Sequence, residues 1–553
     1  MFTPQSYLFK NIIPEVVSKY GNNNALGFVG EEFISYSQMG TRIDAVMAYM
    51  EALGIKPGDR VILYSQNMPN WGIVYFATQC MGVVVVPVLP DFNAYELGNI
   101  ITHSGSKAIF ISKSLDFKLA KVENADTGIV VRLDDFELLK GPEMAPSYDD
   151  NKQYQNTYSP SEDEMSVLLY TSGTTGTPKG VMLSQRNLIT NIYQSNCVQE
   201  ILPTDRFLSV LPLSHTYENT IGFLLAIVNG ASISYLRRPP SGSVLLPALE
   251  KVKPTMMLTV PLIIERVYKG NILKKINSKS ITRNLYKFKP TQKLLNRVAG
   301  KKLYETFGGQ LKFFGIGGAK LDAQVEHFLI DAKFPFAIGY GLTETSPLIA
   351  GCAPGEGKHQ AIGPKVVDSE LKIHNPHPKT GEGEIWYRGA NVMLGYYKNE
   401  EMTKEVLTED GWFKTGDLGT LDKDGFLTHK GRLKSMIVGP SGENIYPEEI
   451  ESLINKFEFV EESLVIEDKG GLVALVHFNM EELEQKVKEM TSDASIKIED
   501  KVVELKADLL EYINSKVNKS SKLQDIIDYV EPFKKTATNK IKRYLYNAEN
   551  VKK

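Results

Sequence analysis

The chain has 553 residues, with 63 Lys and Arg against 66 Asp and Glu, so its formal net charge is −3. Hydrophobic residues make up 42% and charged residues 23% of the sequence, close to the averages for soluble globular proteins. These figures exclude a largely disordered chain, a collagen-like fibre and a basic nucleic-acid binder. Because a single core stops growing beyond about 250–300 residues, we expect at least two domains.

Neither the cysteines nor the apolar runs indicate a secreted or membrane-spanning protein. The three cysteines are widely spaced and form no CxxC pair: Cys80, Cys197 and Cys352. A reduced compartment is therefore expected. The longest apolar runs, such as residues 82–89, are much shorter than the ~18 residues that a spanning helix needs. Lys10 stands where a secretory signal would be apolar, so we expect a cytoplasmic protein.

Short apolar runs alternate with helical patterns in the first third of the chain. Strands are predicted over residues 60–64, 83–89 and 108–111, and helices over residues 69–81 and 95–101. Strands that alternate with helices favour βαβ units and a parallel sheet. Ser37 is expected to be the N-cap of an earlier helix that ends near Gly54.

The run YTSGTTGTPKG at residues 170–180 is dense in hydroxyl groups and glycine, and it follows a predicted strand over residues 165–169. Glycines let backbone N–H groups surround a phosphate, hydroxyls add donors, and Lys179 adds positive charge. It is not a Walker A loop, because Pro178 precedes Lys179 and Gly180 follows it. The alternative is a polar surface loop. The density of hydroxyls favours phosphate binding instead, by these residues: Thr171, Ser172, Gly173, Thr174, Thr175, Gly176 and Lys179.

Two later segments carry groups suited to a nucleotide. LKFFGIGGAKL ends a β-type run at Gly317 and Gly318, where a flat ring can lie against the backbone, although many α/β loops look alike. IGYGLTET places Tyr340 between two glycines, so its ring can present a face to a base. Glu344 beside a phosphate site is a natural Mg²⁺ ligand, because Mg²⁺ takes one or two carboxylates plus phosphate oxygens. The alternative is a strand end with a capped turn.

The next two segments are ambiguous on their own. In GWFKTGDLG, Asp417 follows a glycine and is suited either to a turn or to holding both hydroxyls of a ribose. The C-terminal run PFKKTATNKIKR is a basic tail, which is normally solvated. Its composition does not distinguish among its lysines: Lys534, Lys535, Lys540 and Lys542.

Charge is distributed unevenly along the chain. Residues 251–312 contain 15 Lys and Arg against two acids, which indicates either a solvated face of helices or attraction to an anionic surface or polyanionic ligand. Residues 481–511 are rich in acids and read as amphipathic helix. The turn-rich stretch 431–447 is the best candidate for a domain boundary. After it a helix is predicted over residues 448–457, with strands over residues 464–466 and 472–478.

Taken together, these segments resemble the acyl-adenylate-forming superfamily, which includes acyl-CoA synthetases, peptide-synthetase adenylation domains and firefly luciferase. YTSGTTGTPKG matches the phosphate-loop signature of that superfamily, and GYGLTET, GWFKTGDLG, GRLK…GEN and the terminal lysine segment follow in its order. The resemblance spans almost the whole chain. Within the superfamily the sequence is most similar to long-chain fatty-acid–CoA ligases, on these segments: LPLSHTYENT, VPLIIERVY and GRLKSMIVGPSGENIYPEEIE.

The resemblance implies an α/β protein with the adenylate-forming enzyme fold. A large N-terminal domain of several subdomains with βαβ sheets would span residues 1–432, and a small mobile α+β domain would span residues 433–553. The implied reaction uses ATP, Mg²⁺ and coenzyme A. A fatty acid carboxylate attacks the α-phosphate of ATP, and the coenzyme A thiol then attacks the acyl-AMP. Because an anion attacks a polyanion, catalysis should rest on positioning and on cationic stabilisation.

The resemblance also implies a role for each matching residue. In the nucleotide half, residues 171–179 hold the β- and γ-phosphates, Thr343 contacts the α-phosphate, and Glu344 binds Mg²⁺. The adenine is enclosed by Gly317, Gly318 and Tyr340. The ribose is bound by Asp417 together with Arg432. In the acyl and thiol half, His215 lies near the acyl carboxylate, Lys540 bridges carboxylate and phosphate, Lys434 is the hinge, and Gly442 lines the thiol tunnel.

Two of these assignments have alternatives. The superfamily pattern has glycine before the catalytic lysine, whereas this chain has Asn539, which also tolerates unusual backbone angles. We therefore favour Lys540 over Lys542 or Lys535. His215 could instead be a satisfied core histidine, and its place in LPLSHTYENT favours the site.

Other functions stay open at this point. The acceptor could be acyl carrier protein instead of coenzyme A, and the acid could be medium-chain or aryl. A peptide-synthetase module is disfavoured, because only ten residues follow Arg543. Light emission and a non-catalytic nucleotide or lipid sensor are further alternatives. We expect an apolar acyl tunnel walled near Val260 and residues 315–317, no nucleic-acid partner, and at most a peripheral contact with the inner face of the membrane.

Overall fold

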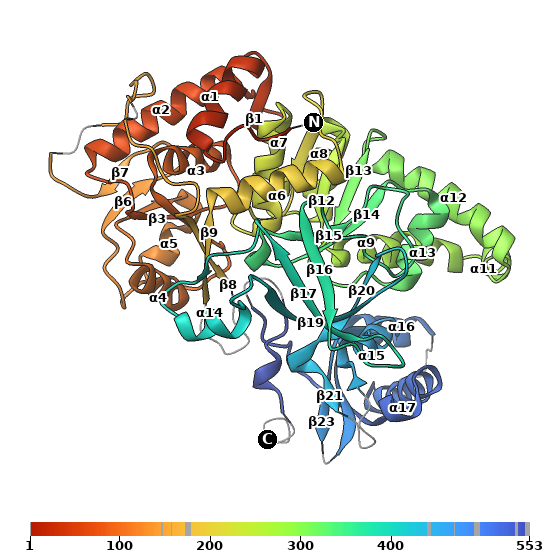
Figure 1. The fold of residues 1–553 in the computed structure, drawn as a ribbon. Helices are drawn as coiled ribbons and strands as arrows, with labels where there is room; N and C mark the ends of the chain where they lie inside the picture. Colours follow the sequence, from red (N-terminus) through yellow and green to blue (C-terminus); the bar gives the residue numbers. More distant parts are fainter. Residues whose placement is uncertain are drawn as a thin grey trace.

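A computed structural model of the chain describes residues 2–144, 147–155, 157–171, 179–438, 444–468, 470–490, 498–536 and 540–547. Within these residues the strands form two eight-stranded sheets, one four-stranded, one three-stranded and one two-stranded sheet. Figure 1 shows the first two thirds of the chain above and the C-terminal segment (blue) below. The predicted α/β class is confirmed.

The first eight-stranded sheet has the order β18-β9-β8-β4-β3-β5-β6-β7. Its strands are β3 (Arg60–Tyr64), β4 (Val84–Val88), β5 (Ala108–Ile111), β6 (Ile129–Arg132), β7 (Leu138–Lys140), β8 (Met165–Thr171), β9 (Lys179–Ser184) and β18 (Gly395–Tyr396). The central strands are parallel and are joined by α3 (Pro69–Met81), α4 (Ala94–Ser104) and α5 (Asp116–Leu119). The predicted βαβ organisation is confirmed, and the boundaries of β3, β5 and α3 match the prediction.

Two helices precede this sheet, α1 (Phe9–Tyr20) and α2 (Tyr36–Ala52). The prediction that Ser37 caps α2 is wrong, because the N-cap is Ser35. The Gln38 N–H donates to Ser35 Oγ at 3.2 Å, and the Ser35 N–H donates to Gln38 Oε1 at 2.7 Å. This reciprocal pair needs Gln three residues after the cap, a spacing that Ser35 satisfies.

The second eight-stranded sheet has the order β15-β14-β13-β12-β10-β11-β1-β2. Its strands are β1 (Asn24–Phe28), β2 (Ile34–Ser35), β10 (Arg206–Ser209), β11 (Ser232–Tyr235), β12 (Met256–Thr259), β13 (Phe313–Ile316), β14 (Phe336–Gly341) and β15 (Leu348–Gly351). All pairs are parallel except those of β2 and β15. The loops after β10, β12, β13 and β14 therefore meet at one edge of the sheet, where α/β proteins bind ligands.

The helices on this second sheet are α6 (Gln185–Val198), the π-helix η2 (Glu218–Leu224), α7 (Leu225–Val228), α8 (Gly242–Val252) and α13 (Ala323–Ala332). Asp322 caps α13, since its carboxylate accepts from the Gln324 and Val325 N–H groups.

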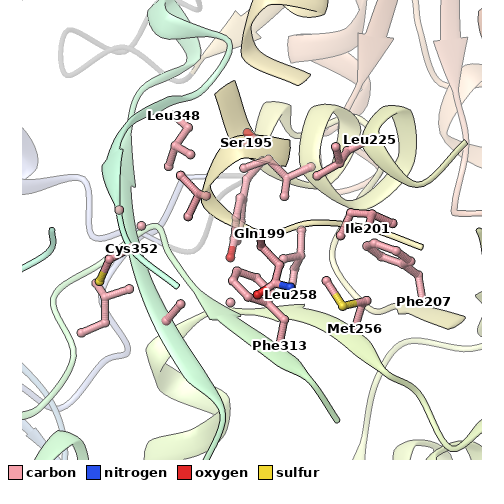
Figure 2. A pocket seen from close by; sticks show the side chains of 18 residues that line it. Ser195, Gln199, Ile201, Phe207, Leu225, Met256, Leu258, Phe313, Leu348 and Cys352 are labelled. Atoms are coloured by element: carbon pink, nitrogen blue, oxygen red, sulfur yellow. The ribbon is translucent and has the colours of Figure 1, made fainter. Parts of the chain in front are cut away.

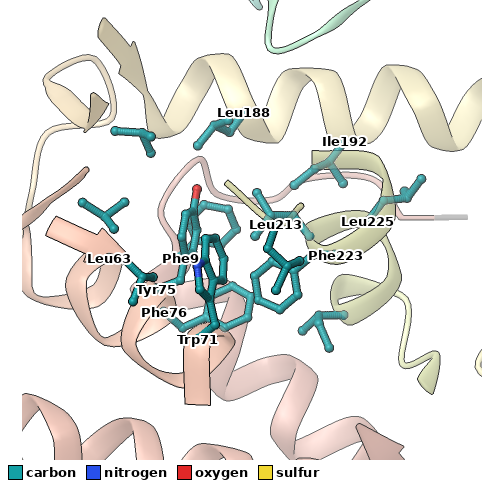
Figure 3. Packing of buried hydrophobic residues seen from close by; sticks show 14 of the residues in the cluster. Phe9, Leu63, Trp71, Tyr75, Phe76, Leu188, Ile192, Leu213, Phe223 and Leu225 are labelled. Atoms are coloured by element: carbon teal, nitrogen blue, oxygen red, sulfur yellow. The ribbon is translucent and has the colours of Figure 1, made fainter. Parts of the chain in front are cut away.

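Fully buried aromatic rings join α3 to η2 and so lock the two large sheets together (Figure 3). Trp71 stacks on Tyr75 with ring centroids 5.2 Å apart, and Phe76 packs on Phe223 at 5.1 Å. Such pairs each contribute about 0.5–1.5 kcal/mol beyond area burial. Gly72 allows the contact, because a Cβ there would lie 2.8 Å from Phe223 Cε2.

The four-stranded antiparallel sheet consists of β16 (Ser369–His374), β17 (Gly383–Gly389), β19 (Phe413–Leu421) and β20 (Leu427–Arg432), with α14 (Glu400–Val406) nearby in the chain. The chain beyond it forms β21 (Ile437–Val438), β22 (Asn444–Ile445), α15 (Pro447–Ile454), β23 (Val460–Asp468), β24 (Gly471–Phe478), α16 (Met480–Met490), α17 (Ile498–Lys516) and β25 (Leu523–Asp528). The described part of the acid-rich segment 481–511 is helical, as predicted. The domain boundary after Arg432 stays a prediction.

The basic region 251–312 is mainly helical after β12. Its helices are α9 (Pro261–Val267), the π-helix η3 (Tyr268–Leu273), α10 (Lys274–Asn277), α11 (Ser280–Leu285) and α12 (Lys289–Thr306). Figure 1 shows α11 and α12 at the edge of the molecule (light green). Across the described residues, no helix is both long enough and apolar enough to cross a bilayer. The three cysteines, all of them described, are free thiols.

Candidate active site

The hydroxyl-rich loop connects two paired strands. β8 and β9 form an antiparallel hairpin whose register pairs Thr171 with Lys179. The residues predicted between them lie outside the described part of the chain: Ser172, Gly173, Thr174, Thr175 and Gly176. The hairpin therefore fixes the two ends of the loop, and the role of its interior stays a prediction.

Lys179 faces Glu344 across the ring of Tyr396. Lys179 Nζ lies 5.3 Å from the centroid of that ring, and the Tyr396 hydroxyl donates to Glu344 Oε1 at 2.8 Å. Desolvation lowers the pKa of Lys179, the charge of Lys434 lowers it further, and Glu344 opposes both. Lys434 is exposed on a short 3₁₀ turn, η5 (Leu433–Ser435), directly after β20. Three charged side chains from distant parts of the chain, Lys179, Glu344 and Lys434, thus interact electrostatically.

Glu344 belongs to the 3₁₀ turn η4 (Thr343–Thr345), which follows β14. The Met393 N–H donates to the Glu344 carbonyl at 2.8 Å and holds the turn. Thr343 and Glu344 are both partly buried. Glu344 Oε1 is engaged by Tyr396, whereas Oε2 accepts no hydrogen bond from the described residues. Among these residues no group of three or more His, Cys, Asp or Glu could hold a metal ion. One free carboxylate oxygen therefore fits a Mg²⁺ whose other ligands are phosphate and water.

Asp417 is nearly fully buried and surrounded by partners. The Tyr340 hydroxyl donates to Asp417 Oδ2 at 2.7 Å, while Arg432 Nε lies 3.2 Å and His429 Nε2 3.8 Å from Oδ1. Burial alone raises the pKa of Asp417, but His429 and the charge of Arg432 outweigh it, so the pKa falls below its ordinary value. Oδ1 accepts no hydrogen bond from the described residues. A buried, ionised carboxylate with one free oxygen suits a neutral hydroxyl donor such as a ribose.

Gly317 and Gly318 follow β13 at the same edge of the sheet. A Cβ on Gly317 would lie 3.1 Å from Tyr217 Cε1, so the Tyr217 ring lies against this glycine. Gly318 has a φ of +85°, which favours glycine, and a Cβ there would meet only Val260 Cγ1, at 3.7 Å. The backbone at Gly318 is therefore accessible to a flat ring.

His215 lies in the loop after β10. The backbone N–H of His215 donates to the Pro212 carbonyl at 2.9 Å. The backbone N–H of Tyr217 donates to the ring atom Nδ1 of His215 at 3.3 Å. Because Nδ1 accepts, the neutral ring carries its proton on Nε2. Desolvation lowers the pKa of His215 to about 4, and the charge of Lys540 adds to the effect. His215 is thus a neutral donor at physiological pH, near Lys540.

Lys540 is held by a short hairpin near the C-terminus. The Thr536 N–H donates to the Lys540 carbonyl at 2.8 Å, and the Lys540 N–H donates to Thr536 Oγ1 at 3.2 Å. Lys540 is an exposed residue, yet desolvation around its ammonium group is the largest effect on its pKa, which falls. Arg432 lowers this pKa further, whereas Asp417 and Glu344 raise it. Lys540 therefore shares two charged neighbours with Lys179, namely Arg432 and Glu344.

The alternative lysines are engaged elsewhere. Lys535 forms an ion pair with Glu462, and Lys542 Nζ lies 3.7 Å from Glu96 Oε1. Asn539 and Gly442 lie outside the described residues, so their expected roles are not addressed by this geometry.

A buried acid holds the loop that carries His215 in place. This residue was not predicted from the sequence. Glu218 is the first residue of η2, and Ser209 Oγ donates to its Oε1 at 2.6 Å. Asn67 Nδ2 donates to Ser209 Oγ at 2.9 Å, and Asn67 Oδ1 accepts from the Leu213 N–H at 2.9 Å. Desolvation raises the pKa of Glu218 to about 8, although the Ser209 hydrogen bond opposes the change. A neutral Glu218 thus anchors both ends of the loop that carries His215.

The reasoning also missed Tyr396 and His429, the partners of Glu344 and Asp417. Neither stands in a segment whose composition signals a site. Glu218 does stand in LPLSHTYENT, three residues after His215. This position was the one signal in the sequence that could have identified it as part of the site.

An apolar pocket lies between α6, η2 and the strands β10, β12, β13 and β14 (Figure 2). Its lining includes Phe207, Leu225, Met256, Leu258, Phe313 and Leu348. Tyr217 and Gly315 line it as well, and a Cβ on Gly315 would lie 2.8 Å from Tyr217 Oη. Gly315 therefore lines this pocket, and its role in an acyl tunnel stays a prediction. Val260 and Gly317 are not among the lining residues, because the Tyr217 ring covers Gly317.

Comparison with known proteins finds a family and several relatives. Residues 13–397 match the family model described as AMP-binding enzyme. Long chain acyl-CoA synthetase 6, peroxisomal, of Arabidopsis thaliana is 30% identical over 494 residues, which cover 81% of this chain and 69% of that protein. Long-chain-fatty-acid–CoA ligase 1 of Saccharomyces cerevisiae is 29% identical over 557 residues, covering 89% and 79%.

Solved structures share the fold. o-Succinylbenzoate CoA synthetase (MenE) of Bacillus subtilis, in complex with its acyl-adenylate intermediate, has a TM-score of 0.75 at 21% identity and covers 97% of each chain. MatB of Rhodopseudomonas palustris with bound ATP has a TM-score of 0.74 at 23% identity, covering 97% of this chain and 98% of that one. The two-domain fold expected from the sequence is confirmed at the level of the whole chain.

Proposed function

The chain belongs to the AMP-binding enzyme family, and from this premise we propose that it is an AMP-forming ligase that joins long-chain fatty acids to coenzyme A. In the first step a carboxylate oxygen bonds to the α-phosphorus of ATP, and the bond to the β-phosphate breaks to release pyrophosphate. In the second step the coenzyme A thiol bonds to the acyl carbon and loses its proton to solvent, while the carbon–oxygen bond to AMP breaks. The products are acyl-CoA and AMP.

One observation carries the proposal: basic and acidic groups from four separate segments converge on one space. Lys179, Arg432, Lys434 and Lys540 influence one another or share the neighbours Glu344 and Asp417. A cluster of cations with so few acids is costly without an anionic ligand. A nucleotide polyphosphate supplies the missing negative charge.

The residue roles follow from these neighbours. Lys540, next to His215 and Glu344, bridges the fatty acid carboxylate and the α-phosphate and stabilises the charge that develops between them. The neutral His215 donates from Nε2 to the acyl carboxylate and brings no second positive charge. Thr343 contacts the α-phosphate from the turn that carries Glu344. Thr171 and Lys179 hold the terminal phosphates.

The remaining nucleotide contacts use β14, β19 and β20. Asp417 accepts the ribose hydroxyls with Oδ1 while Tyr340 occupies Oδ2. Arg432, paired with Asp417, keeps that carboxylate ionised. Gly317, Gly318 and Tyr340 form the adenine shelf. Glu344 would hold the Mg²⁺ that enters with ATP, and that ion would neutralise phosphate charge.

The substrate is an acid with an apolar chain. The pocket beside Tyr217 is lined mainly by hydrophobic side chains, among them those of Phe207, Leu258 and Phe313 from three neighbouring strands. Burying each CH₂ of an acyl chain there is worth about 0.8 kcal/mol. An aryl or medium-chain acid is the alternative, and acyl carrier protein is the alternative acceptor.

The second half-reaction requires residues 433–553 to move as a domain with Lys434 as the hinge. In the arrangement described, this segment contacts the rest through ion pairs that include Lys456–Asp322, which is largely buried, at 3.1 Å, and the exposed pair Lys320–Glu449 at 3.5 Å. Exposed pairs of this kind contribute at most about 1 kcal/mol each. Such contacts can be exchanged for others, which would bring the Gly442 loop to the thiol. We also propose a cytoplasmic location with a peripheral contact at the inner membrane face.

The test is ATP-dependent pyrophosphate release across acids from acetate through C8 to C18, including aryl acids, with and without coenzyme A. Release that is greatest with long chains, with acyl-CoA formed only when coenzyme A is present, supports the proposal. Release without any acyl-CoA favours the carrier-protein acceptor. No release with any acid favours a non-catalytic sensor.

A further inference from the structure

Residues 268–304, from η3 to the residue before Glu305 in the last turn of α12, form a surface that the proposed chemistry does not use. This segment, here called the basic helical surface, contains eleven Lys and Arg and no Asp or Glu. Among the described residues, its ten cations from Lys274 to Lys302 form no ion pair with any carboxylate. Their charge is therefore directed to solvent and available to an external anion.

The same surface exposes large apolar side chains. Between 41% and 72% of the surface is exposed for each of these residues: Ile281, Leu285, Phe288, Leu294 and Val298. On α12 the exposed residues follow a helical spacing, with Lys293, Leu294, Arg297 and Val298 on one side and Asn296 and Leu303 buried on the other. Exposed apolar groups on this scale, rimmed by charge, mark an interaction surface.

From this juxtaposition we propose that the basic helical surface docks on an anionic lipid bilayer, with Phe288, Leu294 and Val298 inserted among the headgroups. Lys and Arg flanking Leu and Phe on one helix face is the arrangement that lies in the membrane interface. Apolar insertion and charge attraction act together there. A soluble polyanion or an acidic protein would use the cations but would leave Phe288 and Leu294 without an apolar environment.

Docking of the basic helical surface on a bilayer would give the protein access to its substrate. Long-chain acids partition into lipid, so a ligase held at a bilayer meets its substrate at high local concentration. This benefit rests on the proposed ligase activity, whereas the docking itself does not. Binding and catalysis can therefore be measured separately.

The test is flotation of the full chain with vesicles of phosphatidylcholine alone and of phosphatidylcholine mixed with phosphatidylglycerol. We expect binding to the mixed vesicles and its loss near 1 M salt, where the Debye length is about 3 Å. Lys287→Gln, Lys293→Gln and Arg297→Gln together should weaken binding about a hundredfold, at about 1 kcal/mol per charge. Three exposed lysines elsewhere provide a charge-matched control that should bind as the parent does: Lys152→Gln, Lys379→Gln and Lys423→Gln.

A second variant separates a bilayer from other anions. Phe288→Ser with Leu294→Ser keeps every cation, and both sites are exposed, so folding should be retained. It should also lose vesicle binding. The proposal is overturned if the parent does not float, or if the apolar variant floats as well as the parent. Both variants should activate octanoate, which is soluble, at the parental rate. Failure of the parent to activate octanoate or any longer acid would count against the proposed ligase function and leave the docking result intact.

Discussion

Tyr340 Oη donates a 2.7 Å hydrogen bond to Asp417 Oδ2, which ties the end of β14 to the middle of β19. The two strands belong to different sheets, and the two residues are 77 positions apart in the chain. The bond turns the other carboxylate oxygen, Oδ1, toward Arg432 and leaves it without a hydrogen bond from the described residues.

Tyr340→Phe should therefore raise the KM for ATP about tenfold with a smaller change in kcat. The buried carboxylate would lose one hydrogen bond, and bonds to charged groups are worth about 1.5–3 kcal/mol. Pyrophosphate release at varied ATP measures this. Tyr64→Phe is the matched control, because Tyr64 is also buried and donates to the Phe92 carbonyl at 3.1 Å, in a separate apolar cluster. Equal effects from both variants would count against a role of Asp417 at the nucleotide.

Lys540→Ala should abolish adenylation while thioester formation from preformed acyl-AMP continues. The ammonium group is required only where carboxylate and phosphate meet, which is the first step. Pyrophosphate release and acyl-CoA formation from synthetic acyl-AMP measure the two steps separately. Lys535→Ala and Lys542→Ala are the controls and should leave adenylation within a few fold. Unchanged adenylation in Lys540→Ala would contradict the assignment of Lys540 to the adenylation step.

Glu344→Gln should raise the Mg²⁺ concentration needed for half-maximal rate by at least tenfold. The amide lacks the charge that a hard cation requires of its ligand. Tyr396→Phe should give a smaller increase, since it removes only the 2.8 Å hydrogen bond that orients the carboxylate. A magnesium titration at saturating ATP checks both. If neither variant changes the magnesium dependence, Glu344 is not the ligand.

Gly315→Ala should shift the preference toward shorter acids. The added Cβ would lie 2.8 Å from both Leu258 Cδ2 and Tyr217 Oη, so it reduces the width of the pocket. One methyl group in an apolar pocket changes specificity by about 10–200-fold, and we expect the ratio of kcat/KM for C16 to that for C8 to fall within that range. Gly242→Ala is the control, because nothing lies within 4 Å of a Cβ there. An unchanged ratio would place the acyl chain elsewhere.

Glu218→Gln should flatten the dependence of stability on pH. The folded-state pKa of about 8 lies above the ordinary value of 4.5, so the folded protein binds a proton that the unfolded chain releases. The stability contributed by protonated Glu218 is complete below about pH 4.5 and is lost as the pH rises toward 8. The parent should lose up to about 1.4 kcal/mol more unfolding free energy per pH unit than the variant in this window.

Urea unfolding from pH 5 to 8 measures this slope. The exposed Glu305→Gln is the control and should follow the parent. A Glu218→Gln slope equal to that of the parent would mean that Glu218 is ionised in the folded protein.

The sequence by itself determined the local elements and the family. Short apolar runs predicted the bounds of β3, α3 and β5 to the residue. An element that is buried on both faces is apolar at nearly every position, so its ends are visible in the sequence. The hydroxyl-rich loop, IGYGLTET and GWFKTGDLG predicted a nucleotide site, because phosphate and ribose require particular groups at close spacing. The cap of α2 was missed by two residues, since Ser35 and Ser37 are equivalent until the position of Gln38 is weighed.

Only the tertiary structure decided which of these groups act on one another. Lys540 differs from Lys535 and Lys542 in its charged neighbours, which come from β19, β20 and η4, and its catalytic role stays a prediction. The raised pKa of Glu218 and the lowered pKa of His215 arise from desolvation, which depends on all surrounding atoms and leaves no pattern in the residues nearby in sequence. Spacing along a chain reports local geometry, whereas electrostatics and packing are set by distances through space.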